Sequence, residues 1–530
     1  ASDAPLAARA SLLRELAAEL AATDDNQGAA DAFQSAYEIF LELGDDLAAA
    51  AMVPGLVDVR HQLGASLDER TGMLRGALRL IAFRCDDAAQ EVRANIHAGL
   101  SAAYMLDRRL AEAIEDGELA QSIAVEDCDR AMRCNLDTTL GSVLLFAGRM
   151  DEAWPLLEGA IERAAGWKFE NQAARGYRML GSAASVLVEY ERAERWLREG
   201  IAYAERVERF NDRHYMTAHL AHVMWATGDW AGAEAEARHA LADGRGGITT
   251  RITALHVLGF LALGRGQSAT FLTEAASLGE GMRELQRISP AWWGLAETAL
   301  RAGDFAAAVA GCEQGFAASA RVRDAAYLFP YVVTGTRAQL ALSGATAARD
   351  WLTRVEELLR ERSIPGTLGA LEHAAGLVHL HEGQTGKARV ALANAAGFWA
   401  SRRRFWEGTQ ALLDQARCAT RSRRPGEAAV FAAQARAAAS AVGAQFDFPS
   451  APVPAPSSAV TGAGPDLPDG ILTAREREIA RVVALGMTNR EIAAALTISP
   501  KTVAAHVEHI LAKLGFARRA QIATWAATRH

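Results

Sequence analysis

The chain has 530 residues, more than one hydrophobic core usually organises, so at least two domains are expected. Half of the residues are apolar, alanine is abundant and only 7% are aromatic, which favours helices over strands. The net charge of −8 is uneven, because residues 470–530 carry nine basic and four acidic side chains whereas the rest of the chain stands at −13. Only this C-terminal segment has the sign of charge that attracts nucleic-acid phosphates.

Membrane spans, disulfides and zinc clusters are all disfavoured by the sequence. No run of eighteen apolar residues occurs, and the first thirty residues alternate Ala and Leu with charged residues instead of forming a signal-peptide core. The five cysteines are scattered and include no CxxC pair, which indicates neither a disulfide framework nor a zinc site. We therefore expect a soluble, cytoplasmic protein without membrane contact.

A repeat of about forty residues occupies most of the chain before residue 446. Its anchor is Gly148, a turn residue that is followed by an apolar residue two positions on and by Ala153 five positions on. The same frame recurs at spacings of 36 to 40 residues, with anchors at Val188, Gly228, Gly264, Gly303, Ser343, Gly383 and Arg423. Mostly small residues also recur seven positions before and twelve positions after the anchors, as at Gly141 and Ala160. Small residues at fixed places on two consecutive helices permit close packing, so each repeat is predicted to be a helical hairpin.

Such hairpins must bury one another's apolar faces, which predicts a superhelical solenoid with a long concave surface. The Leu-Gly steps at Leu140-Gly141 and Leu180-Gly181, together with the downstream alanine, resemble the tetratricopeptide-type repeat. The period of about forty rather than 34 residues implies longer helices or longer connections than in that family. We expect an all-α, tetratricopeptide-like domain over residues 1–445 that receives a small-molecule or protein effector in its concave face.

Residues 446–469 are predicted to be a proline-rich linker. They hold six of the fourteen prolines of the chain, and a helix cannot persist through them. Their composition is typical of an extended, partly polyproline-like connection, and their length disfavours the alternative of a surface loop inside one domain.

Three helices are predicted from Leu472 onward, each with its own start signal. Thr473-Ala-Arg-Glu476 and Thr488-Asn-Arg-Glu491 both fit the T-x-x-E capping box, and Ser499-Pro500 places a capping hydroxyl before a proline at the first helical position. Gly486 and Gly515 are expected to end the first and third helices. The short path from Leu496 to Ser499 leaves a tight turn, so the order is helix, turn, helix.

The third of these helices is predicted to have one buried and one exposed face. The buried stripe consists of Val503, Val507, Ile510 and Leu514. The exposed face presents Lys501, Thr502, Ala505, Glu508 and His509, with Ala504 at its margin. A helix about 10–12 Å across fits the roughly 12 Å wide major groove of DNA. Thr502 at the helix start, with Asn489 and Arg490, is expected to contact phosphates.

Four segments of the tail resemble the LuxR-type helix-turn-helix domain. They are L-T-x-R-E-x-E-I at 472–479, G-M-T-N-R-E-I-A at 486–493, I-S-P-K-T-V-x-x-H at 498–506 and I-L-A-K-L-G at 510–515. The resemblance implies a four-helix domain over residues 470–530 that binds double-stranded DNA as a homodimer. The candidate DNA-binding residues are Thr488, Asn489, Arg490, Ser499, Lys501, Thr502, Ala504, Ala505, Glu508 and His509. Two copies are expected to pair through a fourth helix at 518–528, with Ile522 and Trp525 in the seam.

Two positions depart from the family pattern. Ala504 stands where the family often has a lysine, and the outward Glu508 is acidic. Both weaken the attraction to DNA, so we expect binding that depends strongly on the site sequence and on dimerisation, with modest nonspecific affinity. The alternative is a recognition-like helix that no longer binds DNA.

Large regulators of this family that resemble the maltose activator place a phosphate-loop ATPase before their helical repeats and DNA-binding tail. The present chain matches the last two parts and starts at Ala1 instead of Met. It is therefore either a shorter regulator or one from which an ATPase part upstream has been removed.

Hints of other chemistry are weak. Residues 264–269 fit G-x-G-x-x-A and residues 383–387 suggest a phosphate loop, but both fall on repeat turns; the first follows no strand and the second lacks the required spacing. The pairs His379/His381 and His506/His509 lack the nearby acids or thiols of a metal site. No nucleophile, metalloprotease or triad motif is present, so we expect no enzymatic activity, no cofactor and no metal.

The sequence thus predicts a sequence-specific DNA-binding transcription regulator. Its helical-repeat domain would sense a ligand or protein partner and control dimerisation of the C-terminal domain on DNA. The competing hypothesis is a helical-repeat interaction scaffold with a non-functional DNA-binding tail.

Overall fold

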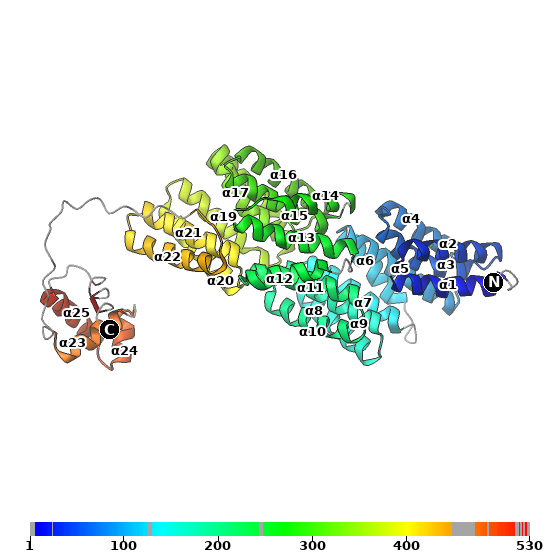
Figure 1. Cartoon of the computed structure of the whole chain (residues 1–530), viewed down its shortest axis with the longest axis horizontal. Helices are drawn as coiled ribbons and strands as arrows, with labels where there is room; N and C mark the ends of the chain where they lie inside the picture. The colour runs from blue at the N-terminus through cyan, green and yellow to red at the C-terminus, as the bar shows by residue number, and fades with distance from the viewer. Residues whose placement is uncertain are drawn as a thin grey trace. The chain divides into compact units, whose positions relative to one another are not determined.

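The computed structural model describes residues 6–23, 25–123, 130–242, 247–282, 284–447, 472–484, 487–514, 519, 522 and 525–526, without the side chains of Ala22 and Arg490. These residues form helices and their connections and include no β-strand, which confirms the predicted all-α class. The chain divides into two compact units, Ala1–Ala451 and Pro452–His530, here called the repeat unit and the tail (Figure 1).

The repeat unit is an array of consecutive antiparallel helices. They are α1 (Leu6–Ala22), α2 (Asn26–Glu42), α3 (Asp46–Gln62), α4 (Leu67–Leu80), α5 (Asp87–Leu106), α6 (Leu110–Ile123), α7 (Arg130–Phe146), α8 (Met150–Gly166), α9 (Glu170–Val186), α10 (Tyr190–Arg206), α11 (Phe210–Thr227), α12 (Trp230–Ala242), α13 (Gly247–Gly264), α14 (Thr270–Met282), α15 (Leu285–Arg301), α16 (Phe305–Val322), α17 (Phe329–Leu342), α18 (Ala345–Arg362), the 3₁₀ turn η1 (Pro365–Thr367), α19 (Gly369–His381), α20 (Thr385–Ser401), α21 (Phe405–Arg421) and α22 (Pro425–Val442). The tail contains α23 (Ala474–Ala484), α24 (Asn489–Ala495) and α25 (Pro500–Leu514).

The forty-residue period follows from the helix and turn lengths. Helices α8, α9 and α10 each contain 17 residues and are joined by three-residue turns, so one helix with its turn takes twenty positions. The middle residue of each turn is left-handed, with φ of 60° at Lys168, 64° at Val188 and 57° at Glu208. The next backbone N–H then donates to a carbonyl five residues back, as from Phe169 to Ala164 at 2.8 Å. This Schellman-type cap ends one helix and starts the next, so the longer repeat comes from longer helices and not from longer connections.

The small residues seven positions before the anchors are contact points between the helices of one hairpin. A Cβ built on Gly141 would lie 2.6 Å from Leu157, and one on Gly181 would lie 2.6 Å from Leu197. Real Cβ atoms essentially never come so close to another atom. The recurring glycine therefore lets a leucine of the second helix sit directly on the backbone of the first.

Two of the eight predicted anchors lie beside the actual turn residue. Gly264 is the last residue of α13 and the left-handed residue is Gly266; Ser343 caps α17 and the residue with positive φ is Gly344. The frame shifts here because α13, α14 and α17 have 18, 13 and 14 residues instead of 17. The other six anchors, including Gly148 and Gly383, have positive φ.

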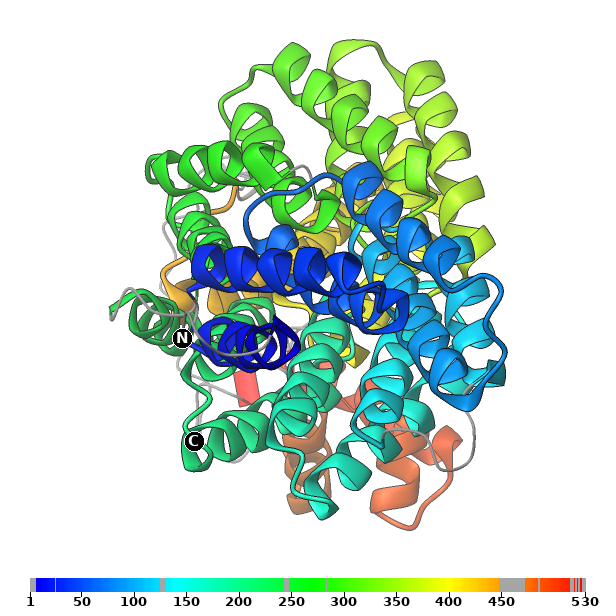
Figure 2. The ribbon, with the colours of Figure 1, turned by 90° about the vertical axis from the view of Figure 1, so that its right-hand side faces the viewer.

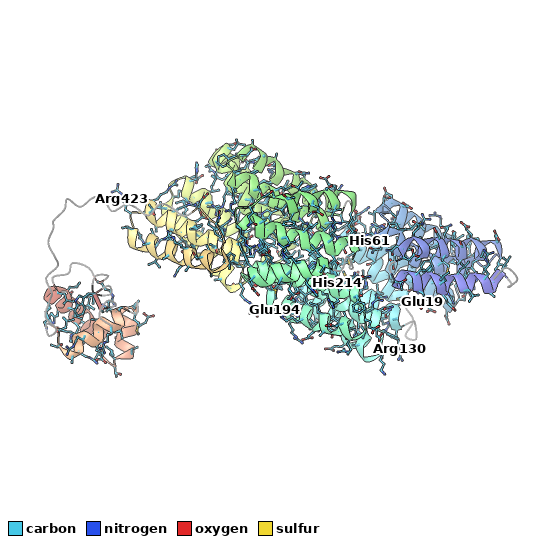
Figure 3. The ribbon with its side chains drawn as sticks, viewed as in Figure 1. Glu19, His61, Arg130, Glu194, His214 and Arg423 are labelled. Carbon is cyan, nitrogen blue, oxygen red and sulfur yellow. The ribbon has the colours of Figure 1, made fainter. Side chains whose placement is uncertain are left out.

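The hairpins wind into a superhelix whose successive turns touch. His61 on α3, labelled in Figure 3, bonds to Glu284 at a separation of 223 residues. Arg402 donates to Glu189 at 2.6 Å across 213 residues, and α11 contacts α21. Figures 1 and 2 show these distant segments in one array of stacked hairpins. Since the separations are similar, one superhelical turn takes about five forty-residue hairpins.

The described part of the repeat unit reaches Asp447, two residues into the predicted linker. The Gln445 N–H donates to the Gly264 carbonyl at 2.7 Å, the Phe446 ring lies 5.1 Å from that of Trp406, and the Asp447 carbonyl accepts from Arg417 at 3.0 Å. The remainder of the predicted linker, 448–469, lies outside the described residues.

Helix α13 is the one helix in the described part of the chain that is long and apolar enough to cross a membrane. Of the 18 residues of α13 that meet this criterion, 78% are buried within the repeat unit. Its apolar character is that of a core helix in a helical array.

The tail has a core of its own. The predicted stripe of α25, from Val503 to Leu514, is buried, and it packs with Ile479 and Val483 of α23 and with Ile492 of α24. Every member of this core belongs to the tail. The predicted helix ends at Gly486 and Gly515 and most of the predicted fourth helix, 518–528, lie outside the described residues.

Candidate nucleic-acid interface

The three start signals predicted in the tail are all formed. The hydroxyl of Thr488 accepts from the N–H of Glu491 at 3.3 Å, and the Glu491 carboxylate accepts from the N–H of Thr488 at 2.7 Å. The same reciprocal pair joins Thr473 and Glu476. Ser499 accepts from the N–H of Thr502 at 3.1 Å. These caps fix where α23, α24 and α25 begin, and thereby fix the direction of α25.

The turn between α24 and α25 is tight and strained. Thr497 is left-handed with φ of 54°, and the N–H of Ile498 donates to the Ala493 carbonyl at 3.0 Å. A non-glycine residue in this region of φ costs on the order of 1–2 kcal/mol. The surrounding contacts must hold it in place.

Arg475 supplies one of those contacts, and sequence reasoning missed it. From α23 it donates to the Leu496 carbonyl at 3.0 Å and to Glu478 at 2.6 Å. Lys513 makes a second contact that sequence reasoning missed. Its ammonium donates to Glu476 at 2.7 Å and so links α25 to α23. These bonds join residues 21 and 37 positions apart, a range at which sequence spacing gives no signal.

The Glu476 carboxylate is held in its ionised form. It is buried, which acts to raise its pKa, but the bonds from Lys513 and Thr473 outweigh burial and lower the pKa of Glu476 to about 2. Glu476 is thus a structural anchor, and Lys513 and Arg475 are engaged within the tail rather than directed to a partner.

The face of α25 opposite its buried stripe is accessible over the first half of the helix. Ser499, Lys501, Thr502, Ala505, Glu508 and His509 are exposed, and Ala504 is half-buried. Pro500 has no N–H and Ser499 caps that of Thr502, so the Lys501 N–H is the backbone donor left at this helix end. The face carries one cation, Lys501, and one anion, Glu508, which makes it a poor generic anion surface.

Asn489 is only partly available for a phosphate contact. Its side-chain oxygen accepts from Arg519, which also donates to the Met487 carbonyl at 2.6 Å. The amide NH₂ of Asn489 is the group left for a partner. The side chain of Arg490, another candidate, lies outside the described residues, whereas Thr488 is exposed at the start of α24.

The two candidates for pairing of copies have different surroundings. Ile522 is 0% exposed and belongs to the core of the tail, next to Ala526. Trp525 is half-buried at the edge of that core. Of the two, only Trp525 has surface that a second copy could cover.

The other stretches considered from the sequence lie on repeat turns. Residues 264–269 join α13 to α14, and residues 383–387 join α19 to α20. Within the described ranges, no group of three or more His, Cys, Asp and Glu side chains is placed to hold a metal ion.

Residues 470–526 match the family model described as "Bacterial regulatory proteins, luxR family". Over 60 residues the chain is 47% identical to a putative HTH-type transcriptional regulator of Mycobacterium bovis, which covers 11% of this chain and 7% of that relative. It is 53% identical over 55 residues to the uncharacterized transcriptional regulatory protein YhcZ of Bacillus subtilis, covering 10% and 26%. With the nitrate/nitrite response regulator protein NarL of Escherichia coli it shares 43% identity over 54 residues, covering 10% and 25%. The matched segments thus span only a small part of this chain and of these relatives.

Two solved structures of helical arrays are similar over most of the chain. A Rap protein complexed with competence and sporulation factor matches with a TM-score of 0.42 and 13% identity, covering 81% of this chain and 99% of the other. The Cut9-Hcn1 hetero-tetramer of the APC/C matches with a TM-score of 0.41 and 11% identity, covering 98% and 96%.

Proposed function

We propose that this chain, whose C-terminal domain is a LuxR-family helix-turn-helix domain, is a sequence-specific DNA-binding transcription regulator controlled through its repeat unit. The observation that carries the proposal is the geometry of α25. Its N-terminal half is exposed beside a tight turn, while caps and the Arg475 and Lys513 bonds fix its direction. A helix presented in this way fits the major groove with its first turns at the base edges.

The contacts divide into those that position the domain and those that read bases. Thr488, the Asn489 amide and Arg490, at the start of α24, face the phosphates together with Ser499 and Thr502. Lys501, Ala505, Glu508 and His509 reach the bases, with Ala504 at the margin. Lysine donates to guanine, a methyl group fits thymine and a carboxylate accepts from cytosine N4.

Specificity rather than net attraction dominates this interface. Glu508 lies on the same face as Lys501, and Lys513 and Arg475 are occupied by Glu476 and Glu478. Few cations therefore remain to displace counterions from DNA, and affinity falls with salt roughly in proportion to their number. Two copies pair on DNA through Trp525, and this dimerisation doubles the number of contacts.

Regulation is assigned to the repeat unit. Its hairpins form a superhelix whose turns touch, so a ligand or protein held inside changes the relative stability of its packed arrangements. Coupling to the tail then acts through dimerisation of the DNA-binding domain.

Site selection tests the proposal. The full chain is used to recover duplexes from a random pool, and the recovered DNA is footprinted. We expect protection of one roughly two-fold symmetric site. Lys501→Ala should weaken binding to that site about tenfold or more, because a base contact is worth about 1–3 kcal/mol. Arg477→Ala on α23, which removes an equally exposed cation outside the interface, is the matched control.

The competing function is an interaction scaffold with an inactive tail. It predicts recovered duplexes without a common sequence and equal, small effects of the two substitutions. That outcome would overturn the proposal.

A further inference from the structure

The repeat unit encloses a cavity of about 150 Å³ near its middle. Helices α11, α13 and α15, at the centre of the unit in Figure 1, supply much of its wall. Further lining residues come from α5, α7, α9 and the starts of α10, α17 and α21, so both turns of the superhelix contribute. Nothing in the DNA-binding function uses these side chains.

One wall of the cavity is aromatic. The Trp225 ring lies 4.7 Å from that of Phe260 and 6.3 Å from that of Trp293, and the Phe260 and Trp293 centroids are 5.2 Å apart. All three side chains line the cavity from three consecutive hairpins. Such a cluster offers flat apolar surface to a planar ligand.

The charged groups that line the cavity are all cations: Arg108, Arg287 and Arg404. Their carboxylate partners, Asp324, Glu284 and Glu407, do not line it. The cavity therefore faces the positive ends of three ion pairs. An anion is favoured there over a cation.

Arg287 is paired with its carboxylate less closely than Arg404 is. Its Nε lies 3.4 Å from Glu284, and the same carboxylate also bonds to His61 and accepts from Gln286 at 2.9 Å. Arg404, in contrast, makes two bonds to Glu407 and a third to Tyr190 at 2.6 Å. Burial acts to raise the pKa of Tyr215, yet the charges of Arg287 and Arg178, with hydrogen bonds from Arg287 and Ser182, together outweigh burial and lower that pKa.

Five buried polar atoms of residues that line the cavity have no hydrogen-bond partner. They are Nε of Arg108, Nε2 of His219, Nε1 of Trp225, Nε2 of His256 and Oε1 of Gln286. His219 uses its other nitrogen on Ser185 at 3.0 Å. A buried polar atom without a partner costs about 1–3 kcal/mol. An indole N–H can only donate, so Trp225 requires an acceptor from the occupant.

The imidazoles do not supply additional charge. Burial lowers the pKa of His256 to about 3, and burial together with Arg404 and His256 lowers the pKa of His222 to about 3. Near pH 7 these rings are neutral. The positive character of the cavity is therefore that of the arginines and persists across the physiological pH range.

The volume sets the size of the occupant. A cavity of about 150 Å³ accommodates one benzene ring. We propose that this cavity binds a small carboxylate with a single aromatic ring, its ring packed on Trp225, Phe260 and Trp293 and its carboxylate bonded to the Trp225 indole and balanced by Arg287. The assignment of this ligand as the effector rests on the proposed function, whereas the binding site itself does not.

The position of the site accounts for a regulatory effect. Trp225 and Arg287 lie on α11 and α15 of one superhelical turn, whereas Arg404 at the start of α21 also lines the cavity and donates to Tyr190 on the earlier turn. A ligand held beside this contact favours the arrangement in which the two turns are packed together.

Calorimetric titration of the full chain tests the site, with benzoate as the probe. Benzyl alcohol, which has the ring without the charge, and acetate, which has the charge without the ring, are the reference probes. We expect benzoate to bind at least tenfold more tightly than either. Equal affinity for benzoate and benzyl alcohol would overturn the role of Arg287, and equal affinity for benzoate and acetate would overturn that of the aromatic wall.

Trp225→Phe keeps the ring and removes the donor, so benzoate affinity should fall about tenfold, which corresponds to about 1.4 kcal/mol. Trp399→Phe is the matched control. The Trp399 indole is equally buried in the repeat unit and equally unpartnered but does not line the cavity, so this change should leave benzoate affinity unaltered. Equal losses in both variants would contradict the proposal.

DNA site selection by the same preparations separates the two hypotheses. Absence of benzoate binding in a chain that selects a DNA site overturns this inference and leaves the proposed function standing. Benzoate binding by a chain that selects no site overturns the proposed function and supports the cavity.

Discussion

The tail and the repeat unit are organised by interactions of different range. In the tail, each helix start is fixed within three residues, as between Thr488 and Glu491. In the repeat unit, decisive contacts join residues more than two hundred positions apart, such as His61 with Glu284 and Arg404 with Tyr190. The first kind of order is local in sequence, whereas the second depends on the pitch of the superhelix.

The tail and the repeat unit also differ in the kinds of side chain that they bury. The described core of the tail is apolar, with Glu476 as its buried charge. The repeat unit buries whole networks, including Asp414 with Arg337, His373 and Arg417. Buried pairs contribute little net stability but are costly to break. The apolar core of the tail supports an exposed helix face, whereas the buried networks of the repeat unit fix the arrangement of its interior.

Breaking the Asp414 network gives the largest expected effect. Asp414 accepts from His373 at 2.9 Å and from Arg417 at 2.9 Å, and it also pairs with Arg337. Asp414→Ala leaves buried polar groups unpaired and should lower the free energy of unfolding of the repeat unit by about 3–5 kcal/mol. Urea unfolding followed by circular dichroism measures it. The exposed Asp151→Ala is the control, expected to change stability by less than about 0.5 kcal/mol; a similar loss in both would show that the network is not decisive.

Alanine substitutions at two glycines test the contact between superhelical turns. A Cβ on Gly148, where φ is 87°, would lie 2.0 Å from the Arg362 carbonyl oxygen, whereas a Cβ on Gly303, where φ is 79°, would meet nothing within 4 Å. Both alanine variants bear the cost of left-handed backbone, about 1–2 kcal/mol. Gly148→Ala should lose at least about 1 kcal/mol more than Gly303→Ala in the same unfolding measurement. Equal losses of stability in the two variants would mean that the close approach of Gly148 to Arg362 does not contribute to packing between the two turns.

Removing a cap examines the local order of the tail. Thr488→Ala deletes the hydroxyl that accepts from Glu491 and should lower the stability of the tail by about 1 kcal/mol. Thr353→Ala on the exposed side of α18, where the hydroxyl bonds to Arg349 within a helix, should leave the tail unchanged. Thermal unfolding of the tail within the full chain measures both effects. A stable Thr488→Ala tail would imply that tertiary contacts alone fix α24.

Acid should weaken the tail slightly through Glu476. Its pKa is lowered from the ordinary 4.5 to about 2 in the folded tail, so its contribution is fully present above about pH 4.5 and is lost as the pH falls toward 2. Lys513 is partly exposed, so solvent screening keeps the effect at or below about 1 kcal/mol. Glu476→Gln should flatten the stability of the tail between pH 5 and 2. An unchanged profile in this variant would assign the acid sensitivity to other carboxylates.

The difference in range explains what the sequence could predict. The caps of α23, α24 and α25 and the stripe from Val503 to Leu514 were predicted because all their signals lie within one helix. The forty-residue period was visible because the turn residues and the glycines that contact leucine recur in phase. The predicted turn positions at Gly264 and Ser343 were wrong, because the helix lengths change there.

The cavity could not be predicted, because its wall assembles residues from Met105 to Arg404 that are distant in sequence. The one available signal was the presence of His219, His222 and His256 on first helices of consecutive hairpins, where apolar residues are expected. Likewise, no spacing rule links Arg519 to Asn489 or Arg475 to Leu496. The length of the superhelical turn must be known before such pairs can be assigned.

The central claim is that α25 reads bases, and a change of specificity tests it most directly. Site selection from a random duplex pool is carried out with the full chain and with Glu508→Gln. A carboxylate accepts from cytosine, whereas an amide pairs with adenine, so the selected site should change from cytosine toward adenine at one position of each half and remain the same elsewhere. Identical selected sites, or none from either protein, would contradict the account.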